Sequence, residues 1–243
     1  MTTEFEKDIK NPDLSTIIDL SYQDRPLLIA FGGIAGALGI PPFEFFNLTR
    51  KHDVNKIYLR DLSQTWYHSG LPGVSKSIDD TATFLRRKID DTGVNKVVVI
   101  GNSMGGYAAI IFGILIKADI VHAFSPQTFI NDDNFIRSKK QIQNVHNNFS
   151  DKYFDLGEVI KLHSNLGKFN IYYDFNNKLD KKHARHLKRS RNVKLHPFIG
   201  GGHLLIKTLR DSGELHNLII SSFNDSPDTP VNSDTNKTPL VPL

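Results

Sequence analysis

The feature that most constrains this chain is the stretch from Val97 to Gly106, which reads VVVIGNSMGG. It opens with four β-branched apolar residues, and such a run predicts a strand buried inside a sheet. A serine then stands between two glycines in a Gly-x-Ser-x-Gly pattern, and a helix-like run follows directly. A strand, a sharp turn and a helix in this order present the serine hydroxyl at the end of the strand. We therefore expect Ser103 to project its hydroxyl into a crevice.

The pattern is short, and a glycine-rich turn with an incidental serine would also match it. The preceding strand and the helix-like run from Tyr107 to Ile116 favour the functional interpretation. In this context the sequence resembles the α/β-hydrolase superfamily over roughly residues 27–220. The resemblance implies an α/β fold in three layers, with helices on both faces of a mostly parallel sheet and a helical cap insertion. Little sequence precedes Leu27, so we expect a reduced sheet.

Length and composition predict one domain, which we place at residues 1–223 of the 243. The segment 224–243 is rich in Asn, Asp, Ser, Thr and Pro without periodicity and is expected to be a disordered tail. No apolar run approaches the roughly 20 residues of a membrane span. The polar start of the chain lacks the basic and apolar regions of a signal peptide. We therefore expect a cytoplasmic protein without a membrane span.

Charge and side-chain chemistry limit the kinds of partner and metal site that we expect. The net charge is +4, and much of the excess lies between Lys178 and Lys194. This segment is either a patch for anionic partners or a solvated helix face. We favour the solvated face and expect no nucleic-acid partner, because no aromatic residues are interleaved for stacking. The absence of cysteine excludes a cysteine nucleophile and thiolate metal sites. His183 and His186 lack a third ligand at fitting spacing, so no metal is expected.

A second glycine-rich segment follows the apolar run from Leu27 to Phe31. The resemblance implies that the loop after this strand gives one N–H to an oxyanion hole, and that the residue after the nucleophile gives the other. The donors would then be Gly33 or Ile34, together with Met104. A dinucleotide-binding loop is the competing interpretation, but the segment lacks the Gly-x-Gly start and two prolines follow it.

Two further segments are candidates for shaping a substrate pocket. Trp66, Tyr67 and His68 follow the strand predicted at residues 56–60, where ligands collect in open α/β sheets. They line the pocket or pack a surface loop, and the sequence does not decide between these roles. The polar segment at about 127–168 is long enough to be functional or to carry its own helices. The resemblance implies that it is the cap, and an excursion away from the site is the alternative.

A serine hydroxyl needs a base within hydrogen-bonding distance, and the base needs an orienting carboxylate. In α/β hydrolases the acid follows the serine and the histidine comes last. His203 fits this order, because it follows the last predicted strand in a loop that begins with three glycines. Asp174 and Asp180 both follow the preceding strand. We favour Asp180, whose surrounding motif resembles the acid loop of a group of bacterial α/β-hydrolase-like proteins, although an N-cap role would also suit it.

These residues together predict a serine hydrolase acting on a small-molecule carboxylic ester or thioester. The expected triad is Ser103, His203 and Asp180, and the chemistry requires no cofactor. The same groups would serve an acyltransferase. The alternative from another class is a non-catalytic binding or scaffold protein in a surface-polysaccharide pathway. The sequence leaves the natural substrate and the oligomeric state open.

Overall fold

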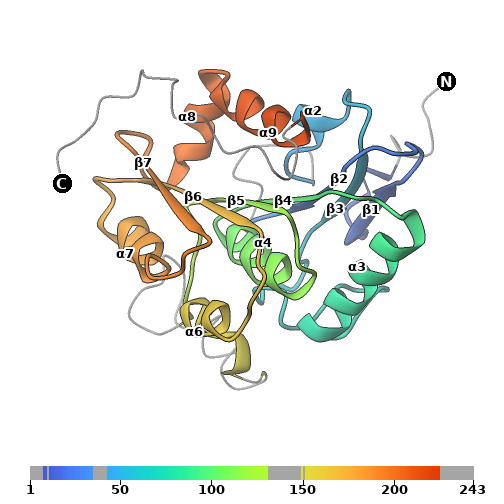
Figure 1. Cartoon of the computed structure of the whole chain (residues 1–243), viewed down its shortest axis with the longest axis horizontal. Coiled ribbons are helices and arrows are strands. Elements are labelled where there is room, and N and C mark those ends of the chain that lie inside the picture. The colour runs from blue at the N-terminus through green and yellow to red at the C-terminus, as the bar shows by residue number, and fades with distance from the viewer. Residues whose placement is uncertain (1–7, 10, 35–42, 131–148, 150, 225–243) are drawn as a thin grey trace.

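The computed structural model describes residues 8–9, 11–34, 43–130, 149 and 151–224. Within these ranges the chain forms a seven-stranded sheet in the order β1-β3-β2-β4-β5-β6-β7 (Figure 1). The strands are β1 (Thr16–Asp19), β2 (Leu27–Phe31), β3 (Asn55–Leu59), β4 (Val97–Asn102), β5 (Ile120–Phe124), β6 (Lys168–Asp174) and β7 (Val193–Phe198). Only β1 runs antiparallel to its neighbour among these strands. The predicted mostly parallel sheet is confirmed, and one antiparallel strand precedes β2.

Helices cover both faces of the sheet, which makes three layers (Figure 1). One layer holds α3 (Ile78–Thr92), α4 (Met104–Leu115), α6 (Leu156–Lys161) and α7 (Lys178–His186). The other holds α2 (Phe46–Thr49), α8 (Leu205–Asp211) and α9 (Glu214–Asn224). Each face has its own hydrophobic cluster. The predicted α/β architecture of three layers is therefore confirmed.

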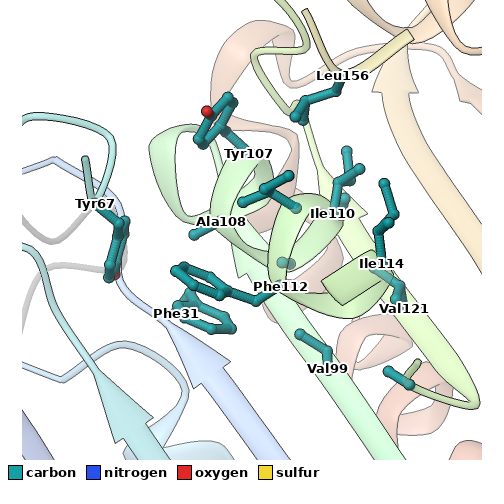
Figure 2. Close-up of a cluster of buried hydrophobic side chains, with 14 of the residues drawn as sticks. Phe31, Tyr67, Val99, Tyr107, Ala108, Ile110, Phe112, Ile114, Val121 and Leu156 are labelled. Atoms are coloured by element: carbon teal, nitrogen blue, oxygen red, sulfur yellow. The ribbon is translucent and has the colours of Figure 1, made fainter. Parts of the chain in front are cut away.

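The central strands are apolar on both sides because both of their faces are covered. Every residue of β2, β4 and β5 is buried. Helix α4 is buried along nearly its whole length, since it lies against β2, β4 and β5 and is itself covered by α6. Figure 2 shows part of the hydrophobic cluster around α4, where the Phe31 and Phe112 rings stack with centroids 4.9 Å apart. This packing holds α4 against the central strands.

The expected insertion at 127–168 is only partly described. Its described part contains a short 3-10 turn at Asp151–Tyr153 and α6, which packs on α4. Residues 131–148 and 150 lie outside the described residues, so the cap stays a prediction. The expected tail also lies outside them, except for Asn224, which ends α9. No helix among the described residues is long and apolar enough to cross a membrane.

A buried histidine of β5, His122, contacts α9. The Ser222 hydroxyl donates to the Leu218 carbonyl, so the His122 Nε2–H donates to Ser222 Oγ at 2.6 Å. The other ring nitrogen, Nδ1, therefore accepts the Tyr172 hydroxyl at 2.9 Å. Burial is the main cause that lowers the pKa of His122 from 6.5 to about 3, and the nearby His196 contributes to the same shift. The ring is thus neutral in the folded protein at pH values where it would be protonated in the unfolded chain.

This difference predicts an acid-sensitive fold. Between pH 6.5 and about 3 the unfolded state binds one more proton at His122 than the folded state, so stability falls as the pH falls. The slope from this group is about 1.4 kcal/mol per pH unit. We expect His122→Gln to lack this contribution to the pH dependence of the free energy of unfolding, measured by urea unfolding from pH 7 to pH 4. Ser222→Ala is the control, because it removes a partner of the ring but keeps the titrating group. An unchanged slope in His122→Gln would show that the folded protein accepts this proton.

Candidate active site

The turn between β4 and α4 has the geometry expected of a nucleophile elbow. Ser103 has φ 56° and ψ −115°, a strained conformation for a residue with a side chain. The backbone holds it from both sides, because its N–H donates to the Phe124 carbonyl and its carbonyl accepts the Tyr107 N–H. The hydroxyl is left at the carboxyl edge of the sheet, as the sequence predicts.

The glycines of the elbow are required by close backbone packing. A Cβ on Gly101 would lie 1.9 Å from the Gly105 carbonyl oxygen. A Cβ on Gly105 would lie 2.3 Å from the Phe31 carbonyl oxygen. Real Cβ atoms are not found at such distances, so any side chain at either position would force the strand and the helix apart. The pattern Gly-x-Ser-x-Gly is thus a packing requirement that also exposes the serine.

Three residues far apart in the sequence form one chain of hydrogen bonds. Ser103 Oγ lies 2.9 Å from His203 Nε2, and His203 Nδ1 lies 2.7 Å from Asp180 Oδ1. The Asp180 side chain is 1% exposed, whereas the His203 side chain is 25% exposed. The structure therefore brings together the three residues that the sequence selected. The Asp180 end of this chain is buried, and the imidazole at its centre is partly open to solvent.

The loop that carries His203 depends on three glycines. Gly200, Gly201 and Gly202 all have positive φ, at 96°, 91° and 56°, a region that residues with side chains rarely adopt. The loop is fastened at its end, where the Gly202 N–H donates to Asp174 Oδ2 at 2.7 Å. Asp174 thus contacts the backbone of the histidine loop, and Asp180 contacts the imidazole itself. The sequence leaves the choice between these two aspartates open, and in the structure they have different partners.

The position of Asp180 follows from how α7 begins. The side chain of Asn177 caps this helix and accepts the N–H groups of Leu179 and Asp180. Asp180 is therefore in the first turn and is not the N-cap. One turn later the buried His183 accepts the Thr128 N–H at Nδ1, with N···N 3.1 Å. This bond attaches α7, the helix that carries Asp180, to the segment after β5.

The histidines of the basic helix are thus accounted for by protein partners. His183 pairs with Thr128, and His186 Nε2 lies 2.6 Å from Asp155 Oδ1. Among the described residues, no three His, Asp or Glu side chains are grouped so that they could hold a metal ion. The basic side chains Lys178, Lys182, Arg185, Lys188, Arg189 and Arg191 are exposed, which agrees with a solvated face.

The segment after β2 lies directly against the elbow. A Cβ on Gly33 would be 2.8 Å from the carbonyl oxygen of Asn102, the residue before the serine. The N–H of Gly33, a predicted oxyanion donor, donates to Glu44 Oε2 at 2.9 Å. Met104 is the first residue of α4, and N–H groups at a helix start have no partner within the helix. Ile34 is the last described residue before the gap at 35–42. These three donors stay predictions.

Trp66, Tyr67 and His68 are all buried and bonded to other parts of the protein. The Trp66 Nε1–H donates to Gln127 Oε1 at 2.6 Å, and His68 Nε2 lies 3.0 Å from the Tyr107 hydroxyl. The Tyr67 hydroxyl donates to the carbonyls of Gly32 and Leu59.

These contacts make the aromatic loop a support for the segment after β2. Burial raises the pKa of the Asp61 carboxyl, which accepts the N–H groups of Ser63, Thr65 and Tyr67 and so holds the loop in shape. Trp66 and Tyr67 both have positive φ, which the surrounding bonds maintain. Substrate binding by these side chains stays a prediction.

Comparison with known proteins identifies the fold. No family model matches this chain, and no curated protein sequence matches it. Several solved structures superpose well. The capsule O-acetyltransferase of Neisseria meningitidis serogroup A has a TM-score of 0.63 at 16% identity, over 85% of this chain and 90% of that one. FphF, a fluorophosphonate-binding serine hydrolase of Staphylococcus aureus, has a TM-score of 0.59 at 15% identity, over 84% of this chain and 85% of that one.

A lipase-esterase related protein from Clostridium acetobutylicum has a TM-score of 0.55 at 14% identity, over 86% of this chain and 99% of that one. Proteins described as lipase-esterase related, as a serine hydrolase and as an α/β hydrolase thus share the arrangement of strands and helices described above. The chain has the α/β-hydrolase fold, as its motifs predict. At these identities the likeness establishes the fold and leaves the chemistry to the residues of the site.

The hydrogen bonds predict which nitrogen of His203 carries the proton. An ionised Asp180 can only accept, so Nδ1 must donate to it, and in the neutral ring Nε2 accepts the Ser103 hydroxyl. We expect ¹⁵N NMR of histidine-labelled protein to show the Nδ1–H tautomer when the ring is neutral. Asp180→Asn should increase the Nε2–H tautomer, because an amide can donate to Nδ1.

Asp174→Asn is the matched control for this measurement. Its amide oxygen can still accept the Gly202 N–H, and it does not touch the imidazole. The tautomer of His203 should therefore be the same as in the wild type. A wild-type ring with its proton on Nε2 would contradict the assignment of Asp180 as its partner.

Proposed function

We propose that the protein is a serine hydrolase that cleaves a carboxylic ester or thioester through an acyl-enzyme intermediate. The observation that carries this proposal is the continuous chain of hydrogen bonds from Ser103 through His203 to Asp180. A binding or scaffold protein has no need for a serine in strained backbone, an imidazole at 2.9 Å and a buried carboxylate behind it. The esterases and serine hydrolases that share the fold support the same class of reaction.

In the first half of the reaction, Ser103 Oγ attacks the acyl carbon while its proton passes to His203 Nε2. Asp180 holds the ring by its Nδ1–H and stabilises the imidazolium that forms. The tetrahedral intermediate collapses when the carbon–oxygen or carbon–sulfur bond breaks. The imidazolium then protonates the leaving alkoxide or thiolate. The acyl group remains on Ser103 as an ester.

In the second half, water attacks the acyl-enzyme and its proton passes to His203. The intermediate releases the carboxylic acid, and Ser103 Oγ takes the proton back. Both tetrahedral intermediates carry negative charge on the former carbonyl oxygen, so donors must be in place for it. We assign the Met104 N–H at the start of α4, together with Gly33 or Ile34 from the segment after β2. The chemistry uses these side-chain and backbone groups alone.

Acyl transfer is the second candidate. It differs only in the group that attacks the acyl-enzyme, since an acceptor hydroxyl would replace water and give up its proton to the same His203 Nε2. One observation favours it: the capsule O-acetyltransferase superposes on this chain with a TM-score of 0.63. The 25% exposure of the His203 side chain leaves the base open to an acceptor from solution. Measuring released acid against transferred acyl group in the presence of glycerol would separate the two.

Substitutions in the site test the proposed function. We expect wild-type protein to hydrolyse p-nitrophenyl esters and Ser103→Ala and His203→Ala to lose about 10⁴-fold or more in kcat. Asp180→Asn should lose about 10²- to 10⁴-fold, because the ring then favours the wrong tautomer. Asp174→Asn should lose much less, since it only loosens the loop. Measuring wild-type rates on esters of increasing acyl length would show how long an acyl chain the pocket accepts.

A fluorophosphonate probe gives a measurement that does not depend on the natural substrate. Ser103 Oγ would attack phosphorus and release fluoride, leaving a stable adduct on the serine. The control is Ser221→Ala, which removes an exposed hydroxyl of α9 that donates to the Leu218 carbonyl. Labelling should persist in Ser221→Ala and vanish in Ser103→Ala. Labelling that survives the loss of Ser103 would contradict the assigned nucleophile.

A further inference from the structure

A cavity of about 420 Å³ lies between the sheet and α9, away from Ser103. Its floor begins at the amino ends of β5, β6 and β7, and Leu218, Ser221 and Ser222 of α9 form one wall. The proposed active site lies at the carboxyl ends of the same strands. Lys168 begins β6 in the cavity, and Asp174, which holds the His203 loop, ends it about 20 Å away. The cavity is therefore a separate site, and its volume is in the range of small-molecule sites.

The strands β6 and β7 have one apolar face and one polar face. The apolar face packs against the hydrophobic cluster around α4 and includes Ile171, Tyr173, Val193 and Leu195. The alternate residues line the cavity, and four of them carry charged or polar groups: Lys168, Asn170, Lys194 and His196. A parallel strand that is covered on both faces is apolar on both. This part of the sheet is therefore built to face water or a polar ligand.

Stacked rings and a hydrogen bond order the floor of the cavity. The rings of His122 and Tyr172 stack with centroids 5.8 Å apart, and those of Tyr172 and His196 stack with centroids 4.7 Å apart. The His196 Nε2–H donates to Asn170 Oδ1 at 3.0 Å. Burial is the main cause that lowers the pKa of His196 from 6.5 to about 4, so the ring is neutral at pH 7. Within the described part of the chain the Asn170 Nδ2 has no partner, so it can donate to a ligand.

Three cationic side chains surround this floor. Lys168, Arg191 and Lys194 line the cavity and are exposed. None of them forms an ion pair with another described residue, and none of the residues that line the cavity is Asp or Glu. Arg191 and Lys194 come after the end of α7, so they are not part of its solvated face. Like charges around one cavity repel each other, and an anion that enters the cavity lowers this repulsion.

The charge and the lining of the cavity indicate the class of ligand. A carboxylate carries one negative charge, whereas a phosphate monoester carries about 1.5 to 2 at pH 7 and offers three acceptor oxygens. The phosphate is the better match for three cations and an amide donor, and the Arg191 guanidinium can bind two of its oxygens at once. Ile120 and Leu218 provide apolar surface for the rest of the ligand.

We propose that this cavity binds a small phosphate monoester, with the phosphate on Lys168, Arg191 and Lys194 and the organic part against Ile120 and Leu218. The ligand is a different molecule from the one that Ser103 attacks, because the two sites lie at opposite ends of the strands. The binding site does not depend on the proposed function, since it uses no residue of the Ser103–His203–Asp180 chain.

Calorimetric titration of the full-length protein with phenyl phosphate and glucose 1-phosphate tests the ligand class. We expect at least one of these esters to bind with Kd below about 1 mM at pH 7.5. The tighter of the two shows whether the organic part is aromatic or a sugar. Phenyl sulfate has the same ring with a single charge and should bind about tenfold more weakly than phenyl phosphate. Binding of neither phosphate ester, or equal binding of phenyl sulfate and phenyl phosphate, would overturn the proposal.

Matched variants test the position of the phosphate. Arg191→Gln and Lys194→Gln should each weaken binding of the preferred ester about tenfold, because each removes a charged donor. The control is Arg189→Gln, which removes the same charge from an exposed residue that does not line the cavity. It should change Kd by less than about twofold, because solvent and salt screen its charge. Equal weakening in Arg189→Gln and Arg191→Gln would show a general attraction of anions and would overturn the proposal.

NMR of ¹⁵N-histidine-labelled protein distinguishes this cavity from the proposed active site. The preferred ester should shift the ring signals of His196 and leave those of His203 unchanged. Ser103→Ala should bind the ester as the wild type does, so a protein without esterase activity that still shows the His196 shift would refute only the proposed function. A shift at His203 without one at His196 would place the ligand in the active site and overturn the proposal.

Discussion

The close approach of three backbone segments is the constraint on which the rest of this structure depends. Strand β4, the start of α4 and the end of β2 meet with distances that leave no room for side chains at Gly101 and Gly105. Because β2 and β4 are adjacent and parallel, their carboxyl ends lie together, and the segment after β2 meets the elbow. The strained backbone of Ser103 persists because this packing over-determines it.

The same constraint explains how residues 23 to 100 positions apart reach one another. Parallel strands place all their carboxyl ends on one edge, so the loops after β4, β6 and β7 converge there. Asp180 arrives on α7, whose His183 is attached to the segment after β5, and His203 arrives on a glycine loop fastened by Asp174. Each of these three loops contributes one side chain to the hydrogen-bonded chain Ser103–His203–Asp180. Other segments supply the bonds that hold the loops in place.

The parts that the sequence predicted well are those with a strong local signal. Continuous apolar runs gave the buried strands, and the glycines around Ser103 gave the elbow, because both patterns reflect packing that few other residues tolerate. The choice of Asp180 over Asp174 needed the resemblance, since order along the chain suits both. The roles of Asn177 as the helix cap and of Thr128 as the partner of His183 were missed, because they depend on contacts between distant segments. Glu44 was missed for the same reason: nothing near it in the sequence indicates that it reaches Gly33.

The site therefore has one buried carboxylate on each side of the elbow. Asp180 lies behind His203, where in the proposed reaction its charge stabilises the imidazolium that forms as the serine attacks. Glu44 lies on the other side of the elbow and accepts the N–H of Gly33, which is a proposed oxyanion donor. Because the Gly33 N–H already has this partner, it can serve an oxyanion only if Glu44 releases it.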